Sequence, residues 1–223
     1  MPVMDEFKKE REALKDAPFS KKLEYFRDYY LMKTIVIVLV LAISGSFLYN
    51  FFFRKQIALY VTLVNFSLIQ ESAEGLTDPF AQENINTKKQ EIFVDSSSYI
   101  SSDQNEINFI KYGYEDEQRL FSMVMTGDMD LFISGKDVLE RYSEQKWFDD
   151  LSTIEGGQEL MKENEDGILV QNGIPIAVKL GDSSLLMKYY YYNGKQGEEV
   201  YAAFPTGSSH RDLAVKFLRY LMQ

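Results

Sequence analysis

The sequence predicts an α/β protein with one long apolar helix near its N-terminus. Behind that helix it predicts a three-layer domain in which helices cover both faces of a mainly parallel sheet. Two observations support this prediction, and a third limits the chemistry. Residues 34–53 form an uninterrupted run without a charge. From residue 56 onward, apolar segments of β-type alternate with segments of helical periodicity. The chain has no cysteine, which excludes disulfides, thiolate metal sites and a cysteine nucleophile.

The apolar run from Thr34 to Phe53 has the length of a transmembrane helix. At about 1.5 Å per residue it spans ~30 Å, the thickness of the hydrocarbon core of a bilayer. A buried core helix is usually shorter. A cleaved signal peptide has a short basic leader and a core of about 7–15 apolar residues, whereas this run is longer and begins only at residue 34. The run therefore favours an uncleaved single-pass anchor, with a signal peptide as the alternative.

The charges around the run predict its orientation. Four cations precede it within a short distance, and two follow it closely: Lys21, Lys22, Arg27 and Lys33, then Arg54 and Lys55. The positive-inside rule places the more basic flank in the cytoplasm. Residues 1–33 are thus predicted to be a cytoplasmic tail, and residues 56–223 an extracellular domain at the cell membrane.

The end of the tail has an apolar face. Phe19, Leu23, Phe26 and Tyr30 follow an i, i+4, i+7, i+11 spacing and share one side of a helix. Tyr29 and Tyr30 stand just before the apolar run, where amphipathic rings sit at headgroup level. We interpret this stretch as a juxtamembrane amphipathic helix. Whether it only enters the membrane or also contacts a partner stays open.

Net charge limits the partners of the domain. Residues 1–55 contain ten Lys or Arg against seven Asp or Glu, which gives a net charge of +3. Because the whole chain carries −10, residues 56–223 carry −13. An acidic domain repels phosphate backbones and anionic lipid headgroups. The sequence therefore predicts no nucleic-acid partner.

The first half of the domain is predicted to hold two strands and two helices. The expected order is a strand over 57–65, a helix or loop over 66–75, a helix over 80–90, a strand over 91–94, a serine-rich loop over 95–105 and a helix within 106–126. Gly127 is expected to end that last helix. Its core-facing residues are expected to be Leu120, Phe121, Val124 and Met125.

The second half continues the alternation. The expected order is a strand over 128–134, a helix over 135–145, an aromatic turn over 146–151, an acidic helical region over 152–167, a hairpin over 168–180, a short helix over 182–192, a strand over 200–204 and a helix over 209–222. The hairpin signal is Asn172-Gly173. The last helix is expected to begin with a capping pattern of Ser209 and Asp212.

Three segments resemble one protein family. Residues 127–151 (GDMDLFISGKDVLERYSEQKWFDDL) and 200–223 (VYAAFPTGSSHRDLAVKFLRYLMQ) resemble parts of the type 2 extracytoplasmic, periplasmic-type solute-binding proteins. The leader FSKKLEYFRDYY resembles that of a membrane-anchored group from Gram-positive bacteria. The family fold has two lobes that close on a ligand. Here only residues 152–166 lie where a second lobe would be inserted, so the resemblance implies about one lobe.

The resemblance implies a membrane-tethered, non-enzymatic binding or accessory protein at the cell surface. The expected partners are the lipid bilayer, contacted through Thr34–Phe53, and a peptide, a sugar or a membrane protein. No cofactor is expected. Two alternatives remain: a structural or assembly subunit of a membrane protein complex, and a surface hydrolase.

Ligands of open α/β sheets bind outside the carboxyl ends of the strands. Small polar residues at strand ends are therefore the predicted binding site, and they are expected to converge. They are Ser96, Ser97, Ser98, Ser134, Gly135, Thr206, Ser208 and Ser209.

Other chemistry has weaker signals. His210 is the only histidine and lies within GSSHRD, which suggests a Ser-His-Asp catalytic site. However, three members so close in sequence do not easily form a triad. A divalent-cation site is suggested by four aspartates, Asp128, Asp130, Asp149 and Asp150, although the sequence has no EF-hand spacing and no phosphate-binding loop. The run Tyr189–Tyr192 suggests either an exposed aromatic patch or core packing.

Overall fold

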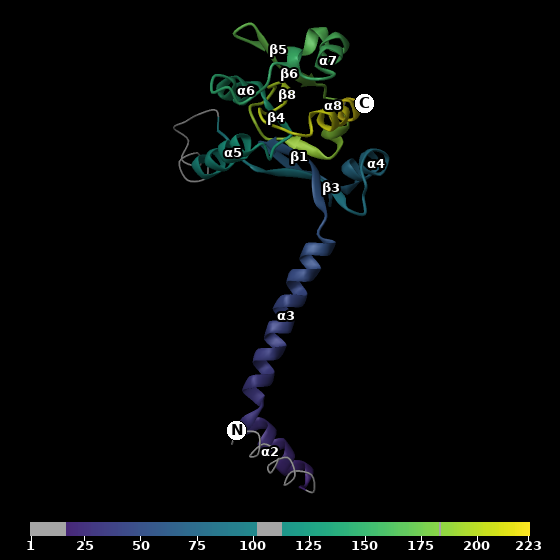
Figure 1. Ribbon diagram of the computed structural model, residues 1–223. Helices are drawn as coiled ribbons and strands as arrows, with labels where there is room; N and C mark the ends of the chain where they lie inside the picture. The colour runs from purple at the N-terminus through teal and green to yellow at the C-terminus, as the bar shows by residue number, and fades with distance from the viewer. Residues whose placement is uncertain (1–16, 102–112, 183) are drawn as a thin grey trace. The chain divides into compact units, whose positions relative to one another are not determined.

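The computed structural model describes residues 17–101, 113–182 and 184–223. The chain divides into two compact units, Met1–Arg54 and Lys55–Gln223. The first contains α2 (Phe19–Tyr29) and α3 (Leu31–Phe53), and the second contains the sheet and the remaining helices (Figure 1). The expectations for residues 1–16 fall outside the described residues.

In the first unit, α3 contains the whole predicted apolar run. Its stretch Leu31–Tyr49 is long and apolar enough to cross a membrane, and none of it is buried inside the structure. A core helix of a soluble protein would be mostly buried, so that alternative loses support. A single helix of this kind near the N-terminus is compatible with a membrane anchor or a signal sequence.

The predicted juxtamembrane helix is α2, and a turn at Tyr30 separates it from α3. Its apolar stripe is uncovered within the described residues: Phe19 is 79 % exposed, Leu23 58 % and Phe26 42 %. Phe19, Leu23 and Phe26 therefore keep apolar surface available, whereas Tyr30, at the other end of the stripe, is half-buried.

The second unit is built on a six-stranded sheet with the order β3-β1-β4-β8-β6-β5. The strands are β1 (Gln56–Val64), β3 (Gln90–Ser98), β4 (Leu131–Gly135), β5 (Ile168–Gln171), β6 (Ile174–Leu180) and β8 (Val200–Ala203). A small second sheet pairs β2 (Phe66–Leu68) with β7 (Tyr190–Tyr192).

The sheet is mixed, so the expected mainly parallel arrangement is found only in part. β1 runs parallel to β3 and to β4, whereas β8 is antiparallel to both β4 and β6, and β5 is antiparallel to β6. The parallel half comes from strands joined by helical crossovers, and the other half comes from the hairpin and the returning chain. The alternation of segments in the sequence does not reveal the direction in which β8 returns.

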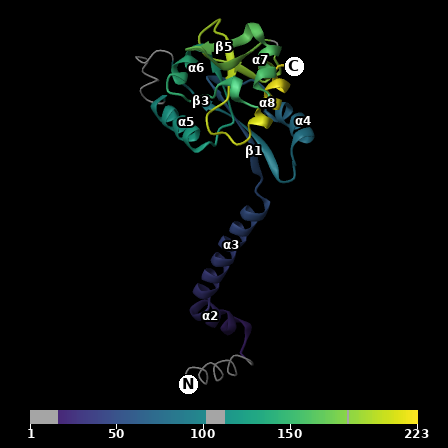
Figure 2. The same ribbon diagram turned by 45° about the horizontal axis from the view of Figure 1, so that its top comes forward.

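Helices cover both faces of this sheet, so the three-layer prediction is confirmed (Figures 1 and 2). One core lies under α4 (Glu74–Asn84), α7 (Gly157–Glu163) and α8 (Arg211–Leu221). The other lies under α5 (Tyr114–Thr126) and α6 (Lys136–Ser143). β4 shows the alternation, since Leu131 and Ile133 belong to the first core and Phe132 to the second.

Two local predictions are confirmed. Asn172 and Gly173 both have positive φ (54° and 80°), as a type I′ turn requires. Gly127 ends α5 in the left-handed region at φ 72°. A Cβ at Gly127 would also lie 2.6 Å from the carbonyl oxygen of Gly207, so only glycine allows this approach.

Several local expectations are wrong. α4 ends at Asn84 rather than filling 80–90, and residues 95–98 extend β3 rather than forming a loop. The expected helix over 182–192 is a short 3₁₀ helix, η4 (Leu185–Lys188), followed by β7. Phe121 and Met125 are 44 % and 59 % exposed instead of facing the core.

Two further points concern the ends of helices. The helix N-cap of α8 is His210, with no capping side chain, so the predicted Ser209–Asp212 pattern is not formed. Between β4 and β5 the chain contains only α6, the 3₁₀ helices η2 (Leu151–Thr153) and η3 (Glu165–Gly167), and α7. Residues 152–166 thus add short helices to the same domain.

Candidate functional site

The predicted site residues lie at two opposite edges of the sheet. We name the edge where β1, β3 and β4 end the carboxyl edge, and the edge where these strands begin the amino edge. Ser96–Ser98, Ser134 and Gly135 belong to the carboxyl edge. Because β8 is antiparallel to β4, it delivers Thr206, Ser208 and Ser209 to the amino edge. The expected convergence of all eight residues is therefore wrong.

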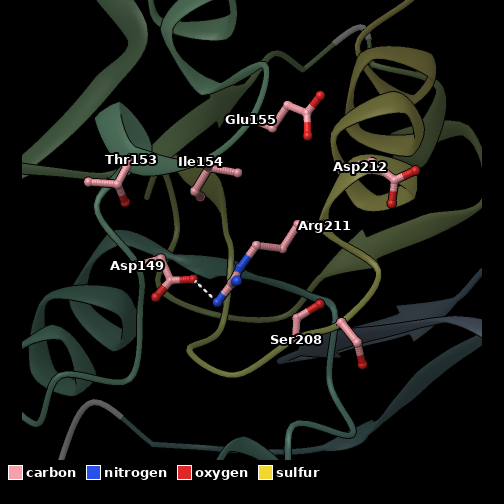
Figure 3. Close-up of a pocket in the computed structure, with 8 residues that line it drawn as sticks. Asp149, Thr153, Ile154, Glu155, Ser208, Arg211 and Asp212 are labelled. Carbon is pink, nitrogen blue, oxygen red and sulfur yellow. Dashed lines mark ion pairs between the residues drawn. The ribbon is translucent and has the colours of Figure 1, made fainter.

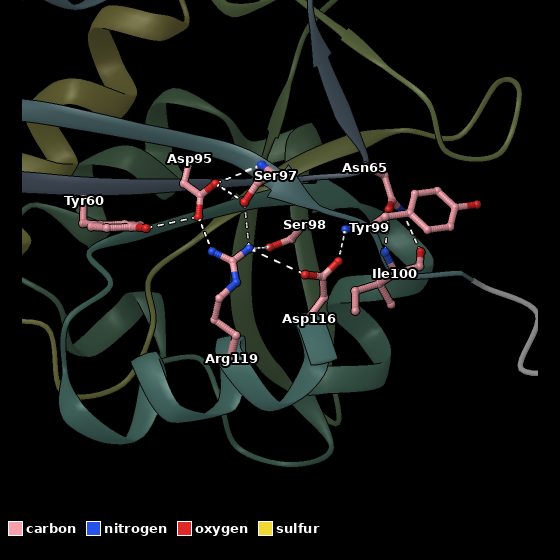
Figure 4. Close-up of polar contacts among 9 residues, drawn as sticks. All are labelled: Tyr60, Asn65, Asp95, Ser97, Ser98, Tyr99, Ile100, Asp116 and Arg119. Carbon is pink, nitrogen blue, oxygen red and sulfur yellow. Dashed lines mark hydrogen bonds and ion pairs between the residues drawn. The ribbon is translucent and has the colours of Figure 1, made fainter. Parts of the chain in front are cut away.

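At the carboxyl edge, the serines of β3 hold an arginine (Figure 4). Arg119, from α5, donates to Asp95 Oδ2 at 2.6 Å, to Ser97 Oγ at 2.9 Å and to Ser98 Oγ at 2.6 Å. Ser97 also donates to Asp95 Oδ1 through its backbone N–H and its hydroxyl. Two of the three predicted serines thus fasten α5 to the sheet, and Ser96 is half-buried beside them.

The charge of Asp95 is stabilised in this network. Burial alone would raise the pKa of Asp95, but the hydrogen bonds from Ser97 and Arg119 outweigh it and hold the pKa below the ordinary value of 3.8. The Tyr60 hydroxyl also donates to Asp95 Oδ2, at 3.1 Å. Burial and the Asp95 charge raise the pKa of Tyr60 to about 12. Tyr60 therefore stays protonated and a donor near neutral pH.

Gly135 makes room for a second fastening at the same edge, a set of hydrogen bonds that connects Tyr192 and Glu198 to the first turn of α6. The Tyr192 hydroxyl donates to Glu198 Oε2 at 2.8 Å, and Glu198 Oε1 accepts the backbone N–H of Asp137 in the first turn of α6 at 2.8 Å. A Cβ at residue 135 would overlap the Tyr192 hydroxyl and the Glu198 carboxylate. Glycine is thus needed here for side chains of this same chain. Ser134 is fully buried, and its hydroxyl donates to Val64 O.

A small cavity of about 270 Å³ remains beside this fastening, lined in part by Asn65, Tyr99 and Lys195. Asn65 closes its inner wall, because its side chain exchanges two hydrogen bonds of 2.7 Å with the backbone of Ile100. The Glu198 carboxylate occupies the first turn of α6, the position that a ligand anion would take at a helix N-terminus. The carboxyl edge is therefore largely filled by the protein itself.

At the amino edge, Asp130 gathers three segments. It is 3 % exposed. Asp130 Oδ2 accepts the Tyr60 backbone N–H at 2.8 Å, and Asp130 Oδ1 accepts the Ser208 hydroxyl at 2.6 Å. His210 Nδ1 lies 3.2 Å from the same Oδ1. Asp130 thereby ties the loop before α8 to β1 and β4.

This cluster contains a serine, a histidine and an aspartate, but in a different order from a hydrolytic triad. In a triad the histidine stands between serine and aspartate and takes the serine proton. Here Ser208 and His210 both contact Asp130, and the buried Ser208 hydroxyl is directed to the carboxylate. Thr206 is also engaged, since its hydroxyl lies 3.0 and 2.8 Å from the carbonyl oxygens of Lys146 and Trp147.

A polar cleft of about 420 Å³ opens next to Asp130, between η2 and the start of α8 (Figure 3). Asp149 pairs with the Arg211 guanidinium inside it. The remaining lining residues are Thr153, Ile154, Glu155, Ser208, Ser209 and Asp212. Of the eight predicted residues, Ser209 is exposed and lines this cleft, and Ser208 forms part of its floor.

Some charged groups of the cleft are not used up by contacts within the protein. Within the described residues, Glu155 and Asp212 take part in no ion pair, whereas Arg211 Nε is buried and has no hydrogen-bond partner. The Arg211 side chain is 37 % exposed although it is paired. A guanidinium has five N–H donors, so donors remain after the pairing with Asp149. The cleft thus offers one positioned cation and two exposed carboxylates.

The aspartates that suggested a metal site are dispersed into other contacts. Asp128 accepts from Thr126, Asp149 pairs with Arg211, and Asp150 accepts the backbone N–H and hydroxyl of Ser152. Among the described residues, no group of three or more His, Cys, Asp or Glu is arranged to hold a metal ion. The tyrosine run is mainly packed: Tyr190 is buried, Tyr192 is half-buried and Tyr191 is exposed.

The sequence analysis missed Asp95, Arg119, Glu198 and Arg211. Arg119 had one usable signal, because it follows Asp116 by one helical turn on a face that also holds Leu120. The other three occur in polar stretches whose partners are distant in sequence. Such pairings depend on the sheet order and have no local pattern.

Comparison with known proteins gives no identification: no protein-family model, curated protein or solved structure matches the chain.

Proposed function

We propose that this protein is a membrane-tethered, non-enzymatic binding protein that holds a polar, amine-bearing ligand in the cleft beside Arg211. The tether is α3, which has the length and apolarity of a membrane span. The observation that speaks against catalysis is the Asp130 cluster, in which the Ser208 hydroxyl and the His210 ring both contact Asp130. Ser208 thus lacks the histidine base that stands between serine and aspartate in a triad.

The charges of the cleft favour one class of ligand. A peptide N-terminus carries an amino group close to a carbonyl oxygen. Glu155 and Asp212 suit the amino group, and the exposed part of Arg211 suits the carbonyl oxygen. An amino sugar offers an amino group close to a hydroxyl oxygen, which can accept from Arg211 in the same way. The pairing with Asp149 fixes the guanidinium before the ligand arrives, which lowers the ordering cost of binding.

The arrangement also supports the proposed relation to solute-binding proteins. The two domain segments that carry the resemblance form β4–α6 and β8–α8, and β4 pairs directly with β8. The described chain contains one sheet domain, and an open cleft encloses a ligand less than two closing lobes do. We therefore infer weak binding of small ligands, in keeping with an accessory role rather than uptake.

The proposed location is the cell membrane, with the N-terminus in the cytoplasm and the sheet domain outside. Protease added to intact cells tests this directly. Digestion of residues 56–223 supports the proposal, and full protection in intact cells with digestion after lysis contradicts it.

A second role is favoured by one observation, the uncovered stripe on α2. A subunit of a membrane complex would use Phe19, Leu23 and Phe26 to contact another membrane protein. Crosslinking in membranes before and after deletion of residues 17–29 separates the two roles. Loss of a defined crosslinked partner supports the assembly role, and an unchanged pattern argues against it.

Ligand binding is tested on the full chain in nanodiscs, with the buried Trp147 as the fluorescence probe of unfolding. The panel comprises short peptides with free or acetylated N-termini and amino sugars with their acetylated forms. We expect stabilisation by the free amines only, lost in Arg211→Gln. Arg219→Gln is a matched control, because Arg219 lies on the same helix, is 38 % exposed and pairs with Glu163. No stabilisation by any compound, or equal loss in both variants, contradicts the proposal.

A further inference from the structure

Three cations gather where the sheet begins. Lys55 immediately precedes β1, and Lys88 and Lys89 immediately precede the start of β3. Gln56 pairs with Gln90 in the parallel register, and the Gln56 backbone N–H donates to Lys89 O at 2.8 Å. Neighbouring strands lie about 4.8 Å apart, so the lysines before the two strands are close neighbours. We name Lys55, Lys88 and Lys89 the basic cluster.

The basic cluster is exposed and uncompensated. All three residues are exposed, and within the described residues none of them takes part in an ion pair. Most cations elsewhere in the sheet domain differ, as Arg119, Lys136, Arg141 and Arg219 each pair with a carboxylate. One acid is close to the cluster: Glu91 lies opposite Ile57 in the register. The local balance is therefore positive.

This local balance runs against the rest of the domain. Residues 56–223 carry −13, which repels anionic surfaces as a whole. Electrostatic attraction to a surface decays within a Debye length of about 8–10 Å, so the groups nearest to the surface dominate. Lys55 follows the last residue of α3 by two positions in the chain. By covalent connection alone, Lys55 stays close to the end of α3.

We propose that the basic cluster binds the anionic phospholipid headgroups of the bilayer that α3 enters. This inference rests on the proposed role of α3 as a membrane anchor. It reverses, for one small surface, the expectation that an acidic domain avoids anionic lipid. Each lysine near such a surface increases the partitioning by roughly fivefold. An exposed apolar side chain also favours contact with the bilayer, because Ile57 beside the cluster is 41 % exposed.

The test uses the full chain, which has no cysteine, so a single label site can be introduced. Thr87→Cys is exposed and directly precedes Lys88, and Ser122→Cys on α5 is the control site. Each carries an environment-sensitive fluorophore. Both are placed in nanodiscs of phosphatidylcholine alone and of phosphatidylcholine mixed with phosphatidylglycerol. Quenching by a spin-labelled headgroup reports proximity to the lipid.

We expect stronger quenching at residue 87 in the anionic nanodiscs, an unchanged signal at residue 122, and loss of the difference at high salt. Lys88→Glu with Lys89→Glu abolishes the difference at residue 87. Lys162→Glu with Lys216→Glu, which changes the charge equally at two exposed lysines, preserves it. Equal quenching at residue 87 in both lipids overturns the inference while leaving the anchor intact. A chain that does not co-elute with nanodiscs overturns the anchor itself.

Discussion

The two edges of the sheet contain similar polar residues and use them differently. At the carboxyl edge, Ser97 and Ser98 bind Arg119, and Glu198 caps α6. At the amino edge, Ser208 is bound by Asp130, yet an open cleft of about 420 Å³ remains beside it. The edge where open α/β sheets usually bind ligands is thus filled by the protein's own groups, and the opposite edge is open.

The direction of one strand produces this difference. An antiparallel β8 carries the serine turn before α8 away from the ends of β1, β3 and β4. The returning chain leaves residues 193–199 at the carboxyl edge instead, and Glu198 comes from that stretch. A candidate binding residue is therefore located by strand direction as much as by its type.

The largest expected effect is at the amino edge. Asp130→Ala leaves the buried Ser208 hydroxyl and the Tyr60 N–H without an acceptor, so we expect a loss of about 3 kcal/mol in the free energy of unfolding. Denaturant unfolding followed by Trp147 fluorescence measures it. Asp128→Ala is the control, because Asp128 is exposed and accepts only from Thr126 among the described side chains. Equal losses in the two variants would show that Asp130 does not hold the loop before α8 to β1 and β4.

The carboxyl edge is expected to lose less. Arg119 is 37 % exposed, so Arg119→Met should cost about 1–2 kcal/mol. Asp95 makes this edge dependent on pH. Its folded pKa lies below 3.8, so its stabilisation is fully present above that value and is lost as the pH falls through the folded pKa.

Asp95→Asn therefore lowers the stability of the full chain near neutral pH, and the gap to the wild type should close below about pH 4. Parallel unfolding curves across this range check it. A gap that widens on acidification would contradict the charged state assigned to Asp95.

Changes at the hydrogen bonds of Tyr192 are expected to lower the free energy of unfolding by a similar or smaller amount. Gly135→Ala forces the Tyr192 hydroxyl aside and should cost about 1–2 kcal/mol, since overpacking of a filled site strains its neighbours. Tyr192→Phe removes that hydroxyl. The double variant should therefore regain part of the loss in the same unfolding assay. Additive losses would show that the contact with residue 135 is not the cause.

The smallest effect on stability is expected in the cleft. Arg211→Gln removes a partly exposed pair and should change the free energy of unfolding by less than about 1 kcal/mol. A change of several kcal/mol, measured in the same way, would mean that Arg211 holds the fold together and is not kept for a ligand.

The sequence predicts the elements well where the pattern is local. The apolar run, the Asn172-Gly173 turn and the Gly127 stop need only their own neighbours, and all are found. The stripe of α5 fails at Phe121 and Met125 because helical spacing does not say how wide the covered face is. The sheet covers only Leu120 and Val124.

The candidate site is predicted less well. Ser97, Ser98 and Ser208 are rightly placed near strand ends, but their partners Arg119 and Asp130 lie 21 to 78 residues away. Which residues meet there depends on strand order and on the direction of β8. Neither leaves a trace in composition or spacing.

The most direct test of the open amino edge is protection of single cysteines by a ligand that stabilises the full chain in nanodiscs. Ser209→Cys places a thiol in the cleft, and Lys195→Cys places one beside the cavity at the carboxyl edge. Our account predicts that the ligand slows thiol modification at residue 209 and leaves residue 195 unchanged. Protection at residue 195 with free modification at residue 209 would contradict it.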